Sequence, residues 1–272
     1  MKISKRIVLV LALCTTALCS LIIAVPLLTP DNEQNTPNET AIQTAIKKAI
    51  TYLEDDYQPY GLLFLNVMYR RFGVTEFSNA VERYDQMMQG NPNGPALRVF
   101  RRIIDHDNQF QDGDMEALYE DIDVLTAPAL YFHRIGLPDD YAVKLENAVN
   151  TGDYLLTHAI LALIWINENG CEIKLPEGFT ENMYNKAATL IDLYQMNEDI
   201  AIEAAAFLYI AGQGSLVDDS FIQQVIADQA VDGGWGQSVD YRWHTTVLGL
   251  LLLLHVEYPS TSYPPMLAPA TQ

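Results

Sequence analysis

The stretch Gln229–His244 reads QAVDGGWGQSVDYRWH and leads directly into an apolar run. Gly233 and Gly234 allow a tight turn in which one residue has a positive φ angle. Trp235 can then lie flat over the end of a neighbouring helix. Gln229 can hydrogen-bond backbone groups that are left open at a helix terminus. The stretch therefore predicts a turn that fastens one helix to another.

The apolar run after this turn belongs to an internal repeat. Asp153, Asp199 and Asp240 each precede a nearly all-apolar helix, and they are placed as N-caps of those helices. The spacing of about 40 residues between copies is the length of a helix hairpin. A looser fourth copy begins at Asp56. The fifth position of the copies is polar and holds, in chain order, Tyr60, Thr157, Glu203 and His244.

Helical periodicity continues almost everywhere beyond Thr40, and no stretch reads as a strand. Helices that are apolar all round are expected to be buried, and they alternate with amphipathic ones such as Thr180–Tyr194. This alternation predicts an all-α fold, an α/α toroid of about five to six helix hairpins, with an open superhelix of helix pairs as the alternative. The expected helices are Ala41–Glu54, Gly61–Phe72, Thr75–Gln89, Pro95–Ile104, Asp114–Tyr119, Val124–Ile135, Asp139–Val149, Tyr154–Asn167, Thr180–Tyr194, Asp199–Ala211, Asp218–Ala227 and Trp243–Glu257.

The N-terminus has the pattern of a membrane anchor. Three basic residues precede Ile7–Leu28, which carries no charge and is long enough to span a bilayer. The positive-inside rule places the N-terminus in the cytoplasm and the domain outside, with a cleaved signal as the alternative. The expected divisions are a signal anchor or transmembrane helix at 1–30, a linker at 31–40, the toroid domain at 41–258 and a Pro-rich tail at 259–272.

The composition of the chain limits which classes of partner the domain is expected to bind. The 272-residue chain has 49% apolar residues and a net charge of −19. Because the three basic residues precede the apolar segment, the part after it is more acidic still. Nucleic acids and anionic membrane surfaces require basic protein surfaces, so neither is expected as a partner of the domain. Cys171 is the one cysteine beyond the anchor, which excludes a disulfide within the domain.

The turn resembles the Gln-Trp repeat of the terpene cyclase and protein prenyltransferase superfamily, on the residues Gln229 to Trp235. The resemblance implies a toroid of paired helices, a fold that also serves polysaccharide lyases and glycosidases. The catalytic motifs of the enzymes are incomplete here. Asp121–Val124 lacks the last Asp of the cyclase Asp-x-Asp-Asp motif. Asp232–Gly234 lacks the Cys of the prenyltransferase zinc site, although Trp243–Thr245 is similar to its His-Thr pair.

The repeat predicts where chemistry would occur. Inner helices of a toroid run parallel, so equivalent positions meet at one mouth of a central cavity, near positive helix ends. Glu203 lies in an apolar helix and needs a partner, such as Arg242 or a His. Two His and one Glu could also hold a divalent metal. No cofactor is identified. The candidate catalytic residues are Glu203, His244 and His158, and the candidate pocket residues are Thr157, Tyr60, Trp235 and Trp243, together with Thr126.

Two functions are consistent with this pattern. The first is a binding or scaffold domain whose central pocket takes a small molecule, lipid or glycan. The second is an enzyme, hydrolase, lyase or cyclase-like, that uses Glu203, His244 and His158 in acid–base chemistry. A cavity in which these three side chains meet favours the enzyme, whereas a cavity filled by Trp, Tyr and Leu side chains favours a structural role.

Overall fold

The structure is a computed structural model that describes residues 39–55, 58–90, 94–118, 120–193, 199–238 and 240–270. The part from Thr40 to Gln272 forms one compact unit. Its described residues form eleven α-helices and no strand, which confirms the predicted all-α class. The helices are α2 (Ala41–Leu53), α3 (Pro59–Phe72), α4 (Ala80–Gly90), α5 (Pro95–Phe100), α6 (Asp121–Ile135), α7 (Tyr141–Thr151), α8 (Asp153–Glu168), α9 (Phe179–Leu193), α10 (Asp199–Ile210), α11 (Asp219–Ala227) and α12 (Arg242–Glu257), with short 3-10 helices at Thr75–Phe77 (η1), Arg101–Ile103 (η2) and Gly214–Leu216 (η3).

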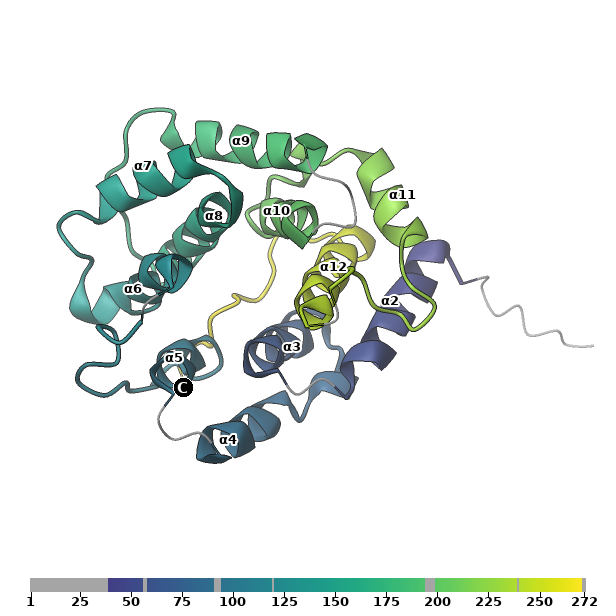
Figure 1. The fold of residues 1–272 in the computed structure, drawn as a ribbon, viewed down its shortest axis with the longest axis horizontal. Coiled ribbons are helices and arrows are strands. Elements are labelled where there is room, and N and C mark those ends of the chain that lie inside the picture. Colours follow the sequence, from purple (N-terminus) through teal and green to yellow (C-terminus); the bar gives the residue numbers. More distant parts are fainter. Residues whose placement is uncertain are drawn as a thin grey trace, which may run out of the picture. The chain divides into compact units, whose positions relative to one another are not determined.

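The helices contact one another in a regular order. Helix α6 packs on α8, α8 on α10, α10 on α12 and α12 on α3, and η2, which follows α5, packs on α3 again. A second series lies outside this one: α2 packs on α12, α4 on α3, α7 on α8 and α9 on α10 (Figure 1). Among consecutive helices, α3 with α4, α7 with α8 and α9 with α10 pack as pairs of one inner and one outer helix.

The inner helices owe their burial to sequences without a polar face. Helix α12 buries every residue from Thr245 to His255, and α10 buries Ile200 to Leu208. Outer helices such as α9 and α11 bury one stripe only. Burying an apolar side chain stabilises a fold by about 1.5–3 kcal/mol, so the core is concentrated where the inner helices touch.

The turn Gln229–Trp235 has the predicted backbone. Gly233 has a φ angle of 95°, and a Cβ placed there would lie 2.3 Å from the carbonyl oxygen of Lys48 in α2. Trp235 is buried against Gly249 of α12, and its indole N–H donates to the carbonyl of Val225 in the last turn of α11. Gln229 departs from the prediction, because its amide donates to Ala45 in the middle of α2 and not to a terminal carbonyl.

Three predicted helices are not single α-helices, and one of them, Pro95–Ile104, divides into α5 and η2. Asp114–Tyr119 does not form a helix in its described residues, because the Asp114 carboxylate accepts hydrogen bonds from the backbone of Gln111 and from Arg98, which stabilises a turn. Thr75–Gln89 is divided at Ser78 into η1 and α4. Local hydrogen bonding of this kind competes with helix formation.

The aspartates that open the repeats are not the caps that their position predicts. Gly152 precedes α8 as its N-cap, and Tyr241 precedes α12, in neither case with a capping side chain. Asp153 is the first residue of α8 and has a φ angle of 47°. Asp199 uses its carboxylate to bond α12, as shown below. At Asp199, a side-chain contact between helices therefore takes the place of capping.

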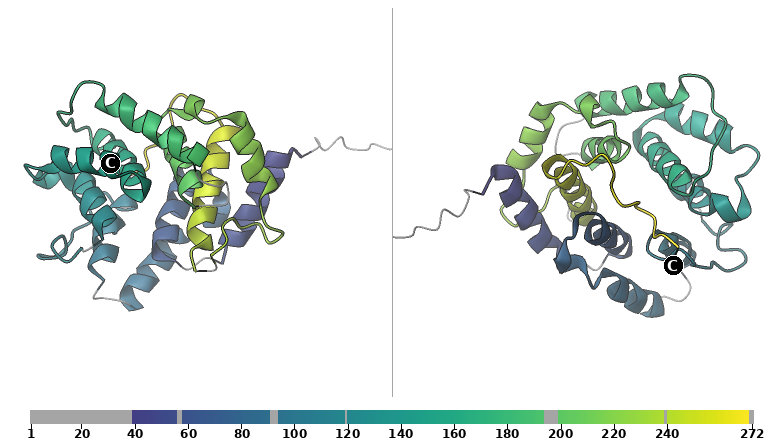
Figure 2. Two further views of the ribbon diagram at one scale, coloured as in Figure 1. Left: turned by 45° about the horizontal axis from the view of Figure 1, so that its top comes forward. Right: turned by 180° about the vertical axis from the view of Figure 1, so that it is seen from behind.

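The tail after α12 is irregular, as predicted, but it is also part of the core. Met266 and Leu267 are buried. Their backbone N–H groups donate to the two carboxylate oxygens of Glu168, at 2.8 and 3.0 Å. Arg70 donates to the carbonyl of Pro265, and the tail reaches Ile103 through the Ala268 N–H. The tail thus crosses the ends of the inner helices and joins α3, α8 and η2 (Figure 2).

The predicted anchor Ile7–Leu28 and the start of the fourth repeat copy at Asp56 lie outside the described residues. Among the helices of the described part, none has the length and apolar character that crossing a bilayer requires.

Candidate functional site

A cavity of about 980 Å³ lies among the inner helices. Its wall is mainly apolar and is built by α3, α5, α6, α8, α10 and α12. The apolar and aromatic lining includes Leu63, Phe64, Phe100, Leu161, Trp165, Phe207, Trp243, Val247 and Leu248. The polar lining is gathered near the N-terminal ends of α6, α8, α10 and α12 and includes Asp123, Thr126, Tyr154, His158, Asp199, Glu203 and His244. Cavities of this kind, apolar with a few convergent polar groups, are typical of small-molecule sites.

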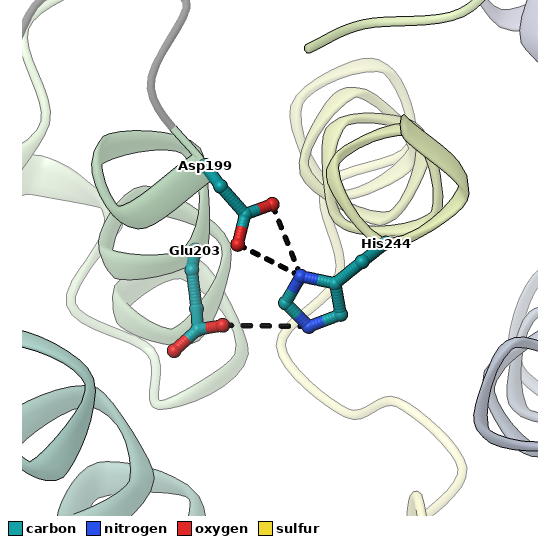
Figure 3. A group of neighbouring side chains, drawn as sticks. All are labelled: Asp199, Glu203 and His244. Carbon is teal, nitrogen blue, oxygen red and sulfur yellow. Dashed lines mark hydrogen bonds and ion pairs between the residues drawn. The ribbon is translucent and has the colours of Figure 1, made fainter. Parts of the chain in front are cut away.

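Asp199 fixes the imidazole of His244. The His244 Nδ1 lies 2.9 Å from Oδ2 and 3.0 Å from Oδ1 of Asp199, which leaves Nε2 directed toward Glu203 (Figure 3). The Thr245 hydroxyl donates to Oδ1 of Asp199 at 2.6 Å, and the Tyr154 hydroxyl donates to Oδ2 at 3.1 Å. Both oxygens of Asp199 are therefore held, and the Nδ1–H tautomer of His244 is selected.

Glu203 is fully buried and lies between two histidines. Its Oε1 accepts a hydrogen bond from the Thr157 hydroxyl and lies 3.4 Å from Nδ1 of His158. Its Oε2 lies 3.5 Å from Nε2 of His244 and has no hydrogen-bond partner. A buried carboxylate oxygen without a partner is costly, so this atom points to a ligand that would satisfy it.

The electrostatic environment shifts the pKa values of His244 and Asp199 in opposite directions. Burial lowers the pKa of His244, but the hydrogen bond to Asp199 and the charges of Glu203 and Asp199 outweigh it and raise the pKa above its ordinary value. Burial raises the pKa of Asp199, but its bonds to His244, Thr245 and Tyr154 lower it overall. The pair is thus stabilised as an imidazolium and a carboxylate. Opposed shifts of this kind are enriched at functional sites.

Asp199, Glu203 and His244 are the residues that could hold a metal ion. Each offers one ligand atom, and these atoms all lie within 4.8 Å of one another. The sequence predicts two His and one Glu for this role. His158 is not in the group. Its Nδ1 lies 2.8 Å from the carbonyl oxygen of Tyr154. We call Asp199, Glu203 and His244 the acid–base cluster.

The other predicted residues have separate places. Tyr60, Thr126 and Trp243 line the cavity. Thr157 is buried, is not among the lining residues and reaches the site through Glu203 and His158. Trp235 does not line the cavity, because its ring packs against Gly249 on a different side of α12. Arg242, a predicted partner of Glu203, is not among the described residues that line the cavity. Its guanidinium pairs with the carboxylate of Asp232 instead.

From the sequence, Asp199 is interpreted mainly as a helix cap, and Asp123 is not predicted as a site residue. Asp199 shares its register with Asp153 and Asp240, so its position predicted a cap. The signal that distinguishes it is Thr245 beside His244, since both side chains bond its carboxylate. Asp123 lines the cavity, and burial raises its pKa, although the charge of His158 opposes the shift.

Comparisons with protein-family models, with curated proteins and with solved structures found no match for this chain.

Proposed function

We propose that this domain is an α/α toroid that binds an apolar small molecule in its central cavity and holds the polar group of that molecule at the acid–base cluster. The proposal rests chiefly on Glu203, a fully buried carboxylate with one unpartnered oxygen in the wall of an apolar cavity. The toroid is supported by the order of helix contacts, which returns to α3, and by the alternation of buried and amphipathic helices.

Binding can be tested with Nile red, a neutral apolar dye that fluoresces when it leaves water. The wild-type domain should bind it. Val247→Phe places a larger side chain in the cavity wall and should weaken binding at least tenfold. Val143→Phe is the matched control, because Val143 is 56% exposed on α7. Equal dye binding by the two variants would contradict a ligand in this cavity.

An acid–base enzyme is the second candidate. The observation in its favour is that Asp199 holds Nδ1 of His244 while Nε2 faces Glu203. Such an imidazole can accept a proton at Nε2 and return it, and the carboxylate beside it can stabilise the imidazolium. Nδ1 of His158 lies 3.4 Å from Oε1 of Glu203. These groups suit a hydrolase, a lyase or a cyclase-like proton transfer to a bound ligand.

Proton transfer can be separated from binding. Ligands extracted from the purified protein would be incubated with it in heavy water, and deuterium incorporation would be followed by mass spectrometry. The enzyme hypothesis predicts incorporation by the wild type and its loss in His244→Gln and Glu203→Gln. Retained binding without any exchange in the wild type would leave the binding function alone.

We further propose that the domain is held outside the cytoplasm by the apolar segment Ile7–Leu28, which three basic residues precede. Protease added to spheroplasts should digest the domain. Complete protection from the protease would contradict this topology.

A further inference from the structure

The charge of the cavity wall limits what can bind in it. The lining holds the carboxylates of Glu120, Asp123, Asp199 and Glu203, and no Lys or Arg stands among the described lining residues. The two imidazoles that face these carboxylates are those of His158 and His244. Four carboxylates and two protonated imidazoles would still leave the wall with a formal charge of −2. Binding an anion here would therefore add to a net negative charge, with no Lys or Arg in the described lining to offset it.

The arginines of this domain that are buried near the inner helices lie elsewhere. Arg70 and Arg102 donate to carbonyl oxygens of the tail, at the opposite ends of α3 and α8 from the cluster. They do not line the cavity. The phosphate or carboxylate head of an anionic lipid would thus find no Lys or Arg in the described lining, whose carboxylates outnumber its imidazoles.

Aromatic rings surround the acid–base cluster. The Trp243 ring lies 5.3 Å from the His244 ring, and the Phe207 ring lies 6.3 Å from the His158 ring, with both aromatic side chains in the cavity wall. Tyr154, which also lines the cavity, bonds Asp199. Carboxylates combined with aromatic faces are the groups that recognise an ammonium ion, through charge-assisted hydrogen bonds and cation–π contacts.

From this wall we infer that the ligand is an apolar amine whose ammonium group donates a hydrogen bond to the unpartnered Oε2 of Glu203 while its hydrocarbon part fills the apolar cavity. The inference rests on the proposed binding function and names the chemical class of its ligand. It also accounts for the buried Oε2, since an ammonium N–H supplies the donor that this oxygen lacks.

The test is displacement of Nile red by decylamine, decanol and decanoic acid, which share a chain length and differ in the charge of the head. The buffer is neutral and contains a chelator, so that metal ions do not occupy the cluster. Decylamine should displace the dye at a concentration at least tenfold lower than decanol, and decanoic acid should be the weakest. Decanoic acid as effective as decylamine would overturn the inference.

Variants separate the cluster from the general acidity of the protein, because a net charge of −19 attracts amines to any surface. Glu203→Gln should reduce the preference for decylamine over decanol about tenfold and leave decanol displacement unchanged. The matched control Glu181→Gln, at an exposed position on α9, should keep the full preference. An unchanged preference in folded Glu203→Gln would also overturn the inference.

Two further outcomes are informative. If Glu203→Gln does not fold, by circular dichroism, Asp123→Asn replaces it, and a preference that this variant leaves intact counts against the inference. If Nile red binds the wild type and is blocked by Val247→Phe, but the amine has no advantage, the ligand class is wrong and the binding function stands. If Nile red does not bind at all, the binding function itself fails.

Discussion

Helix α12 carries one histidine near each end, and the protein shifts their pKa values in opposite directions. His244 in the first turn has a raised pKa, because Asp199 and Glu203 outweigh the effect of burial. His255 in the last turn has a pKa lowered to about 4 by burial, with Arg71 adding to the shift. The helix dipole alone would favour the reverse, since it stabilises cations at the C-terminus. The neighbouring side chains therefore decide the charge.

Two glutamates also differ, in this case in the number of hydrogen bonds that their carboxylate oxygens accept. Glu168, at the end of α8, has a backbone N–H on each carboxylate oxygen, and both N–H groups come from the tail. Glu203, in α10, has one oxygen without a partner and faces a cavity. A polar group whose bonds are complete holds the fold together, whereas one whose bonds are incomplete can hold a ligand. We refer to these regions as the tail end and the cluster end.

The largest effect is expected at the tail end. Truncation after Tyr258 removes the buried Met266 and Leu267 and leaves Glu168 without its two donors. The free energy of unfolding, measured in urea, should fall by about 5 kcal/mol. A midpoint equal to that of the full chain would show that the tail is not part of the core.

Gly233→Val tests whether the turn before α12, which leads into the cluster end, stabilises the fold. The residue has a φ angle of 95°, and a Cβ would meet the backbone of Lys48 at 2.3 Å. The expected loss of stability is about 3 kcal/mol or more, from backbone strain and overpacking together. Gly90→Val serves as the control, because a Cβ there has open space and no positive φ.

The two histidines should give opposite pH dependences of the unfolding free energy. The native state disfavours protonated His255, so its contribution to stability falls as the pH decreases from 6.5 toward 4, by up to about 3 kcal/mol. His244 has a raised pKa, so its contribution is complete below pH 6.5 and is lost as the pH rises through the native value. Urea titrations of His255→Gln and His244→Gln, from pH 4 to above pH 6.5, measure both. Parallel profiles for the two variants would refute the contrast.

The smallest effect distinguishes the glutamates. Glu168→Gln keeps one acceptor and loses the charge, so it should destabilise the protein by about 1–2 kcal/mol. Glu203→Gln relieves the buried Oε2 that has no hydrogen-bond partner but loses the ion pairs with His158 and His244. These effects oppose each other, so the net change in stability should be less than about 1 kcal/mol. Thermal and urea unfolding compare the two variants directly. A larger loss in Glu203→Gln would mean that its bond to Thr157 is structural.

Much of the fold follows from sequence because it depends on local patterns. The 3.6-residue periodicity predicts the inner helices, and two adjacent glycines predict the positive φ at Gly233. Asp114–Tyr119 was predicted as a helix because the pattern does not show that Arg98, in α5, binds the Asp114 carboxylate. Contacts between distant segments override local preference there.

The sequence predicts the site only in part, because the repeat places equivalent residues at the same level along neighbouring inner helices. The register brings Glu203 and His244 to one level, and they lie 3.5 Å apart. The register does not reveal that Asp199 bonds His244, because that contact depends on how α10 and α12 pack. It also does not separate Trp243, in the cavity wall, from Trp235, in the core.

The position of the tail has a consequence for the order of synthesis. Helix α2 packs on α12, and the tail joins α3, α8 and η2, so the earliest described helices have partners that the ribosome makes last. We therefore expect the domain to complete its fold only once the tail up to Ala268 has left the ribosome, while α6 to α10, which contact one another in chain order, gain structure earlier. Nascent chains arrested at Tyr258, with a spacer to clear the ribosome, should remain sensitive to protease where chains arrested after Gln272 resist it.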